Sequence, residues 1–152
     1  MKLLYHTWFR IGSAYTANGI VDLLKEVEAS LPKNIKKVFF RADSGFFSGK
    51  LFDLLESFGW DYLVKVKLKN LVELLKKQEW EVIDKQKDIA ICEFAYKASS
   101  WKEARVLKAI RTVKEYVETD FFGEGKIVPV IQYACYIRTY KLDAASLHKI
   151  YK

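Results

Sequence analysis

The sequence predicts a mixed α/β fold whose second half is rich in β-strands. In the first 78 residues, short apolar runs alternate with segments whose apolar residues recur at helical spacing. This alternation favours helices layered on a sheet with parallel strands. After Trp80 the chain changes to long stretches of Val, Ile, Tyr and Phe separated by turn-forming residues, a pattern typical of antiparallel strands.

Three strands and three helices are expected in the first half. The strands are 3–10, 36–42 and 60–67, and the apolar segment 36–42 is expected to be buried. The helices that follow them have these apolar stripes: Ile20, Leu23, Leu24, Val27 and Leu31; Leu51, Leu54, Leu55 and Phe58; and Leu68, Leu71, Val72 and Leu75. Each stripe gives its helix one face for packing against a sheet.

The ends of the first two helices carry recognisable signals. Thr16 or Asn18 is placed to cap the first helix, and Pro32 is placed to end it. Ser48 is placed to cap the second helix and Gly59 to terminate it.

The second half predicts an antiparallel β-section followed by the beginning of a helix. The expected strands are 80–84, 88–97, 105–117 and 127–140. Residues 142–152 predict a further helix, with Asp143 as its N-cap.

Composition favours a folded protein with an anionic partner. Hydrophobic residues make up 51% of the chain and charged residues 30%, which excludes disorder over the whole length. The formal net charge is +7 and the pI about 9.3, so nucleic acid is the first partner to consider and a membrane surface the second. Lysine-rich faces that contact only water would give the same balance.

Other features set the expected compartment. Cys92 and Cys135 are far apart and have apolar neighbours, so they predict buried thiols rather than a metal site. We expect no signal peptide, because His6 and Arg10 interrupt the first apolar stretch. With no apolar run near the roughly 20 residues of a membrane span, a cytoplasmic location is expected.

Asp43 is the sharpest candidate for chemistry. It stands at the carboxyl end of the predicted strand 36–42, the end at which open α/β sheets bind ligands. A carboxylate there could hold a hard cation such as Mg²⁺. The alternative, that Asp43 only starts the following Ser-Gly-Phe-Phe-Ser-Gly turn or caps the next helix, fits the residues equally well.

One carboxylate cannot support two-metal chemistry, which needs acids from several elements. Asp61 begins a strand, Asp84 lies in a lysine-flanked stretch, and Glu93 lies in the middle of a strand. His6 and His148 have no partners at ligand spacing. The sequence also has no Gly-x-Ser-x-Gly motif and no glycine-rich phosphate loop, so common hydrolase and nucleotide-binding sites are not supported.

Two groups of basic residues are candidate phosphate contacts. The first consists of Lys65, Lys67 and Lys69 on one strand and its exit. The second consists of Arg105, Lys108 and Arg111, preceded by Trp101, which could stack on a base. Solvated strand faces and a core tryptophan would explain both groups as well.

Two longer stretches carry a resemblance to a known family. The run KKVFFRADSGFFSGKLFDLLESFGWDYLVKVKLKNL resembles the catalytic domain of bacterial insertion-sequence transposases of the DDE type, and RADSGF is distinctive of one subgroup. The upstream FRIGSAYTANG is similar to the family's R-x-G-N-x-x-S/T-x-x-G loop. The agreement in order and spacing runs from about residue 5 to the end of the chain.

The resemblance implies specific roles. Asp43 corresponds to the second acid of the triad, a ligand of catalytic Mg²⁺ in DNA strand cleavage and transfer. The first acid lies upstream of anything in this chain, and the third follows a Tyr-x-x-Arg-x-x-x-Glu pattern of which Tyr151 is the start. The implied DNA-contacting residues are Arg41, Ser44, Phe46, Lys65, Lys67, Trp101, Arg105 and Arg111.

The resemblance also implies a partial ribonuclease H-like fold with a β-rich insertion. Residues 1–78 would form the partial core, 79–141 the insertion, and 142–152 the start of the truncated last helix. We therefore expect a transposase fragment that is inactive alone and that binds insertion-sequence ends, itself or full-length transposase, but no membrane. The alternatives are a non-catalytic DNA-binding or regulatory module and a gene remnant without function. Because segment 3–10 would lack its neighbouring strand, the fragment is expected to be marginally stable or self-associating.

Overall fold

The computed structural model describes residues 19–119, 123 and 125–138. Its helices are α1 (Ile20–Ser30), the short 3₁₀ helix η1 (Ser44–Phe46), α2 (Gly49–Ser57) and α3 (Leu71–Lys76). Its strands are β1 (Phe39–Ala42), β2 (Asp61–Lys65), β3 (Glu81–Asp84), β4 (Ile89–Tyr96), β5 (Arg105–Thr119) and β6 (Gly125–Arg138). The predicted strand 3–10, the predicted helix 142–152 and the capping residues Thr16, Asn18 and Asp143 lie outside the described residues.

The helix ends follow local chemistry. Helix α1 ends because Leu31, which precedes Pro32, is extended with φ −62° and ψ 135°. Gly59 has φ 69° just after α2, a conformation that glycine adopts without a Cβ clash. Ser48 does occupy the N-cap position of α2, but its side chain makes no capping hydrogen bond, so that part of the prediction was wrong.

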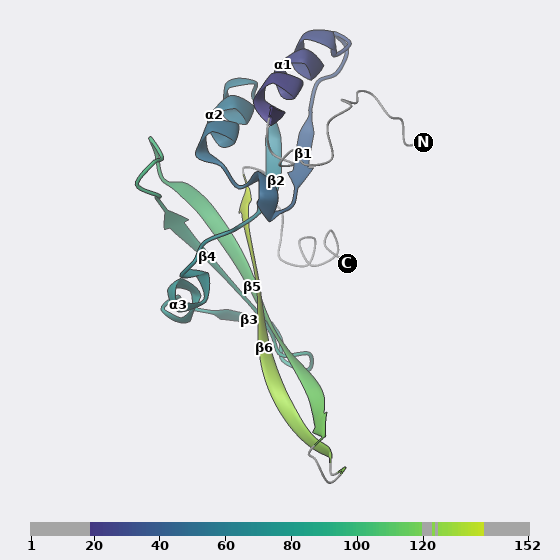
Figure 1. The fold of residues 1–152 in the computed structure, drawn as a ribbon, viewed down its shortest axis with the longest axis vertical. Helices are drawn as coiled ribbons and strands as arrows, with labels where there is room; N and C mark the ends of the chain where they lie inside the picture. Colours follow the sequence, from purple (N-terminus) through teal and green to yellow (C-terminus); the bar gives the residue numbers. More distant parts are fainter. Residues whose placement is uncertain (1–18, 120–122, 124, 139–152) are drawn as a thin grey trace.

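The described strands form one mixed sheet in the order β1-β2-β6-β5-β4-β3. Strands β1 and β2 are parallel, whereas every other pairing is antiparallel (Figure 1). Strand β6 lies beside β2, so the β-rich second half continues the sheet that the first half begins. The expected mixed α/β class is confirmed, and within the described strands the parallel pairing is limited to β1 and β2.

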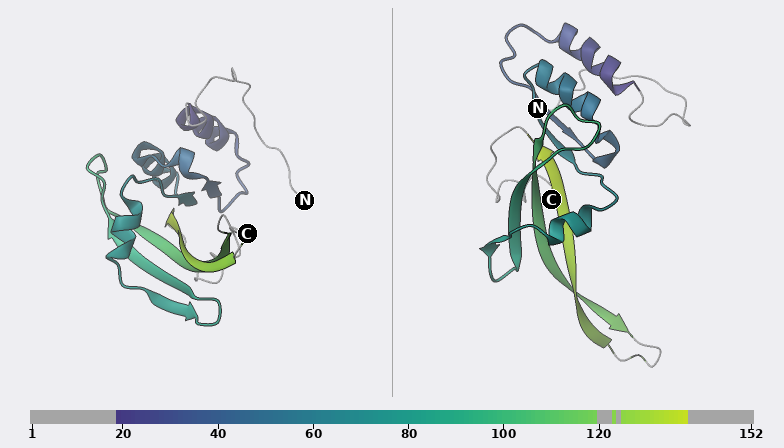
Figure 2. Two further views of the ribbon diagram at one scale, coloured as in Figure 1. Left: turned by 60° about the horizontal axis from the view of Figure 1, so that its bottom comes forward. Right: turned by 90° about the vertical axis from the view of Figure 1, so that its left-hand side faces the viewer.

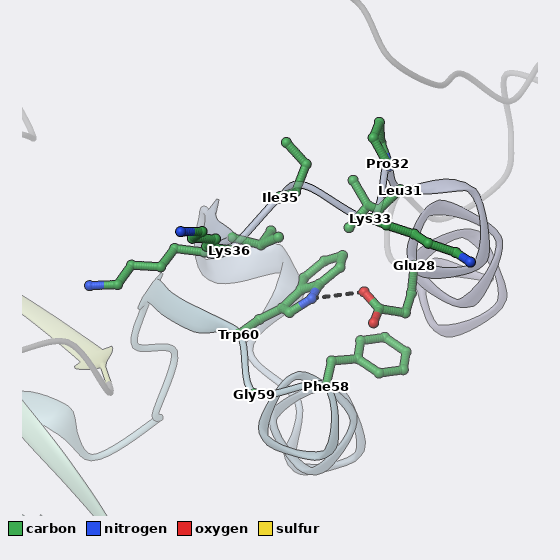
Figure 3. A pocket seen from close by; sticks show the side chains of 11 residues that line it. Glu28, Leu31, Pro32, Lys33, Ile35, Lys36, Phe58, Gly59 and Trp60 are labelled. Carbon is green, nitrogen blue, oxygen red and sulfur yellow. Dashed lines mark hydrogen bonds between the residues drawn. The ribbon is translucent and has the colours of Figure 1, made fainter.

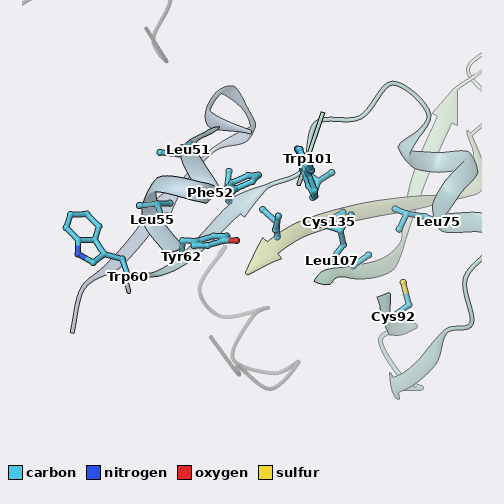
Figure 4. Packing of buried hydrophobic residues seen from close by; sticks show 14 of the residues in the cluster. Leu51, Phe52, Leu55, Trp60, Tyr62, Leu75, Cys92, Trp101, Leu107 and Cys135 are labelled. Atoms are coloured by element: carbon cyan, nitrogen blue, oxygen red, sulfur yellow. The ribbon is translucent and has the colours of Figure 1, made fainter. Parts of the chain in front are cut away.

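One face of the sheet carries the main core. The buried side chains of α1, α2 and α3, among them Leu24, Phe52 and Leu75, share a cluster with the sheet residues Tyr62 and Leu107 (Figure 4). The ring of Phe52 stacks on that of Tyr62 with centroids 5.3 Å apart. Neighbouring residues of a strand point to opposite faces, and a smaller cluster covers the other face: Leu63, Ile89, Ile110 and Tyr136.

Two burial predictions can be compared with the structure. Strand β1 was expected to be buried, but it alternates between exposed and half-buried residues, and Phe39 is 45% exposed. It is the end strand of the described sheet and packs only one face against the core. Cys92 and Cys135 are free, buried thiols as expected, and burial raises the pKa of Cys92 to about 11 and that of Cys135 to about 12.

Strands β5 and β6 extend beyond the sheet as a two-stranded arm (Figures 1 and 2). Strand β4 stops pairing at Thr112, and seven pairs from Val113↔Ile131 to Thr119↔Gly125 continue in β5 and β6 alone. We call residues 113–119 and 125–131 the arm. One of its faces is apolar and open to water, since Val117 is 68% and Ile127 62% exposed.

Candidate functional site

Asp43 leaves the carboxyl end of β1, as the sequence predicted. It is exposed and caps η1, and its Oδ1 accepts a hydrogen bond of 2.8 Å from the backbone N–H of Gly45. The turn-starting role that the sequence left open is therefore real. It occupies one carboxylate oxygen, and Oδ2 makes no hydrogen bond with any described residue, so a cation could still be coordinated.

The loop after Asp43 is anchored to the core by its aromatic residues. Phe46 and Phe47 are half-buried and pack against the main cluster. The ring of Phe47 lies 5.6 Å from that of Phe52 in an edge-on contact. Ser44 is half-buried, and its carbonyl accepts the N–H of Phe47 at 3.3 Å. The carboxylate therefore stands on a loop that is held at both ends.

Strand β2 brings basic residues to the same edge of the sheet. Ala42 pairs with Val64 in the parallel register, so Asp43 and Lys65 follow neighbouring positions at the carboxyl ends of the two strands. Lys65 and Lys67 are exposed, and Arg41 is an exposed residue of β1. The structure thus gathers Arg41, Asp43, Ser44, Phe46, Lys65 and Lys67 at one edge.

Trp101 lies in the loop between β4 and β5 and is only 6% exposed. Its ring meets Phe47, Phe52 and Tyr96, each with centroids 5.7 Å away. A Cβ added at Gly49 would stand 2.6 Å from its Cδ1 atom. Trp101 is a core residue that packs the β4–β5 loop against the loop after Asp43, and little of its ring is left for stacking on a base.

Gly49 permits this close contact, so its replacement is expected to be costly. Gly49→Ala should lower the free energy of unfolding by about 1–3 kcal/mol, because the new methyl overlaps a ring held by other aromatic residues. Urea denaturation measures the change. In a Trp101→Ala background the same substitution should be neutral to within about 0.5 kcal/mol. An equal cost in both backgrounds would show that the contact is not the cause.

Arg105, at the start of β5, is buried and paired with two carboxylates of α2. Its Nη2 donates to Asp53 Oδ1 at 2.6 Å and to Glu56 Oε2 at 2.8 Å, and its Nε donates to Glu56 Oε1 at 2.8 Å. The guanidinium also lies over the ring of Trp101, 5.2 Å from the centroid. The hydrogen bond to Glu56 is the main cause that raises the pKa of Arg105. Arg105 thus joins β5 to α2 and is not available to DNA.

Glu56 receives a second donor, the hydroxyl of Tyr62, at 2.6 Å. Burial alone would raise the pKa of Glu56, but the hydrogen bonds from Arg105 and Tyr62 outweigh it, and the net pKa lies below the ordinary 4.5. Burial and the neighbouring Glu56 raise the pKa of the Tyr62 hydroxyl.

Acid should therefore weaken the fold through Glu56. A carboxyl whose folded-state pKa is lowered stabilises the protein above its ordinary pKa, and this contribution is lost as pH falls from 4.5 through the lower value. We expect Glu56→Gln to lower the melting temperature at pH 7, with the difference from the parent shrinking below pH 4.5. Thermal melts between pH 7 and 3 measure this, with exposed Glu73→Gln as the control. A difference that stays constant with pH would contradict it.

The other basic residues of β5 lie elsewhere. Lys108 is three residues from Arg105 and so lies on the opposite face, where its Nζ is 3.7 Å from Glu93. Arg111 lies over the ring of Trp80 at 5.4 Å, with a nitrogen 4.0 Å from Asp88. Six residues of strand separate it from Arg105, roughly 20 Å. Arg111 is therefore not part of the edge at Asp43.

The two largest hollows on the described surface also lie away from Asp43. One, of about 230 Å³, is at the opposite ends of β1 and β2 and includes Lys33 and Lys36 (Figure 3). There the indole N–H of Trp60 donates to Glu28 at 2.9 Å. The other, of about 470 Å³, lies beside β3 and includes Trp80. The carboxylate of Asp43 thus stands on an open edge and not in a pocket.

The donor set at Asp43 fits one ligand of a hard cation and not a whole metal site. A carboxylate oxygen is the kind of ligand that divalent cations such as Mg²⁺ take. Across residues 19–119 and 125–138, no three His, Cys, Asp or Glu side chains come together to hold a metal. Asp43 could therefore supply one ligand of a site whose others come from elsewhere.

Sequence reasoning missed Gly49, Asp53 and Glu56. Asp53 and Glu56 are three residues apart on α2, a spacing that places them on one helix face. That pair was the available signal for a cation partner, but its partner is about 50 residues away along the chain.

Comparison with known proteins identifies the family. No helix within the described residues is long and apolar enough to cross a membrane. No curated protein and no solved structure matches the chain. The family model described as transposase DDE domain group 1 matches residues 2–135, most of the chain, including Asp43 and the whole of β1 to β5. The chain therefore belongs to the DDE transposase family.

Proposed function

We propose that this chain acts in DNA transposition and that Asp43 is a ligand of the divalent cation on which the family depends, with Mg²⁺ as the cation. The observation that carries the proposal is the position of Asp43, an exposed carboxylate at the carboxyl end of β1 in a chain of this family. When bound, such a cation assists attack on a DNA phosphodiester. The motif Arg-Ala-Asp-Ser-Gly-Phe supports placement in the subgroup that carries it.

The residues around Asp43 have different proposed roles. Arg41, Lys65 and Lys67 are exposed at the same edge and would contact DNA phosphates. Ser44 would contact the backbone beside them, and Phe46 would fix the loop through its packing. Arg111 remains a proposed DNA contact farther along β5. The burial of Trp101 and the ion pairs of Arg105 remove both from this proposal.

We further propose that these 152 residues bind DNA but do not cleave it by themselves. The support is the single carboxylate at the site, since two-metal cleavage needs acids from several elements. The division into a partial ribonuclease H-like core (1–78), an insertion (79–141) and the first turns of a further helix (142–152) belongs to the same proposal. DNA as the partner places the chain in the bacterial cytoplasm.

Binding and cleavage of insertion-sequence end DNA test the two parts separately. The purified chain is expected to bind a labelled duplex with an affinity that falls steeply with salt, and to leave it uncut with Mg²⁺ or Mn²⁺. Asp43→Ala should not change that binding by more than about twofold, because an acid does not attract phosphate. Mg²⁺-dependent nicking that is lost in Asp43→Ala would overturn the inactivity, and binding that does not respond to salt would overturn the role in transposition.

The arm supports a second candidate, a regulatory module that pairs with itself or with full-length transposase. Strand alternation places Val117, Ile127 and Ile131 on one face of the arm, which carries a single charge, Glu115. Such a face suits protein rather than DNA. Two arms packed face to face would cover roughly 500 Å², from seven residues at about 3.4 Å on two strands in each copy. This is well below a standard interface of about 1,200–2,000 Å², so the expected dimer is weak.

Self-association through the arm predicts an effect confined to one face. Sedimentation velocity should show a dimer that grows with protein concentration in the parent chain and that Ile127→Lys abolishes. The matched control is Val130→Lys, which adds the same charge to the opposite face and should leave the dimer in place. A parent that stays monomeric at every concentration would contradict this.

A further inference from the structure

The β4–β5 loop and the loop after Asp43 are neighbours through one contact. Trp101 fills the space over Gly49 and also meets Phe47, so residues flanking the tryptophan lie close to the end of the Asp43 loop. The pairing of Arg105 with Asp53 holds the same loop against α2. Two segments about 50 residues apart in sequence thus form one continuous surface beside Asp43.

Three lysines stand on this surface. Lys97 and Lys102 belong to the β4–β5 loop, and Lys50 follows Gly49 in the first turn of α2. All three are exposed, and none forms an ion pair with a described residue. We call Lys50, Lys97 and Lys102 the rim.

The carboxylates nearest to the rim do not cancel its charge. Asp53 and Glu56 of α2 are both engaged by the guanidinium of Arg105. Glu103 is the remaining exposed acid of the β4–β5 loop, against the two lysines there. The rim therefore keeps a net positive charge that faces water, which favours an anionic partner.

We propose that the rim binds the phosphate backbone of duplex DNA next to Asp43, extending the contact surface of Lys65 and Lys67 across α2 to the β4–β5 loop. This rests on the proposed function, since DNA is the anion that the family acts on. The contact positions DNA without reading its sequence, because lysines are point charges for phosphates and the aromatic residue between them, Trp101, is buried.

The salt dependence of DNA binding counts the phosphates that the rim contacts. For duplex DNA, the slope of log K against log salt changes by about 0.9 for each phosphate contact. The triple variant Lys50→Ala, Lys97→Ala, Lys102→Ala is expected to lose about 2.7 from the slope. Fluorescence anisotropy with a labelled duplex between 50 and 300 mM salt measures it. All three side chains are exposed, so the variant should melt at the parent's temperature.

A second triple variant controls for the loss of charge alone. Lys76→Ala, Lys77→Ala, Lys85→Ala removes three exposed lysines near α3 and the β3–β4 turn and should change the slope by less than one unit. Equal loss in the two variants, or an unchanged slope in the rim variant of a chain that does bind, would overturn the rim alone. A parent chain without salt-dependent DNA binding would overturn the proposed function together with the rim.

Discussion

Trp101→Ala is expected to lower the free energy of unfolding by about 3–5 kcal/mol, the cost of removing a large aromatic residue from a packed core. The ring is 6% exposed and is surrounded by Phe47, Phe52 and Tyr96. No strand pairing holds the β4–β5 loop to the loop after Asp43, so the ring carries this contact. Urea denaturation followed by circular dichroism measures the change, with the slope m compared between variants.

A smaller aromatic residue distinguishes packing from DNA contact at this position. Trp101→Phe keeps most of the buried area and should recover more than half of the lost stability. DNA affinity should follow the fraction of folded protein in both variants. A stability change below about 1 kcal/mol in Trp101→Ala, with a selective loss of DNA binding, would mean that the ring faces DNA after all.

Arg105→Ala is expected to cost about 2–4 kcal/mol. The guanidinium is buried, so its removal deletes three charge-assisted hydrogen bonds and the contact with Trp101. The loss should fall short of that for a fully buried ion pair, because the side chains of Asp53 and Glu56 are 39% and 38% exposed and water can solvate them once the arginine is gone. Urea denaturation at pH 7 measures the change.

Two variants frame the result at Arg105. Arg105→Lys keeps the charge but cannot bridge two carboxylates with a planar fork, so it should retain only part of the stability. Lys114→Ala, at an exposed position of the same strand, should change stability by less than about 0.5 kcal/mol. If Arg105→Ala were as mild as Lys114→Ala, the link between β5 and α2 would have no energetic weight.

Much of the fold could be predicted because its elements are encoded locally. The stripe from Ile20 to Leu31 at helical spacing gives α1, and Pro32 ends it. The long runs of Val, Ile, Tyr and Phe give β4, β5 and β6 within a few residues. Asp43 could be found because a strand end and a small polar loop are also local features.

The partners of the site residues could not be predicted, because they depend on contacts between distant segments. Trp101 and Arg105 have the same local pattern whether they face DNA or the core. What places them in the core is Gly49 under the indole and the Asp53 and Glu56 carboxylates beside the guanidinium, all about 50 residues earlier. Local periodicity contains no information on such pairings. The exposure of β1 was missed for the same reason, because it depends on its position in the sheet.

Binding of Mn²⁺ to the folded chain tests most directly whether Asp43 is a metal ligand. Mn²⁺ broadens the NMR signals of nearby nuclei, and one carboxylate should bind it weakly, so the titration extends to millimolar metal. The account predicts that the backbone amide signals of Ser44 and Gly45 broaden first and that Asp43→Asn, which keeps the shape of the side chain, abolishes this. Broadening that is centred elsewhere, or that is unchanged in Asp43→Asn, would contradict it.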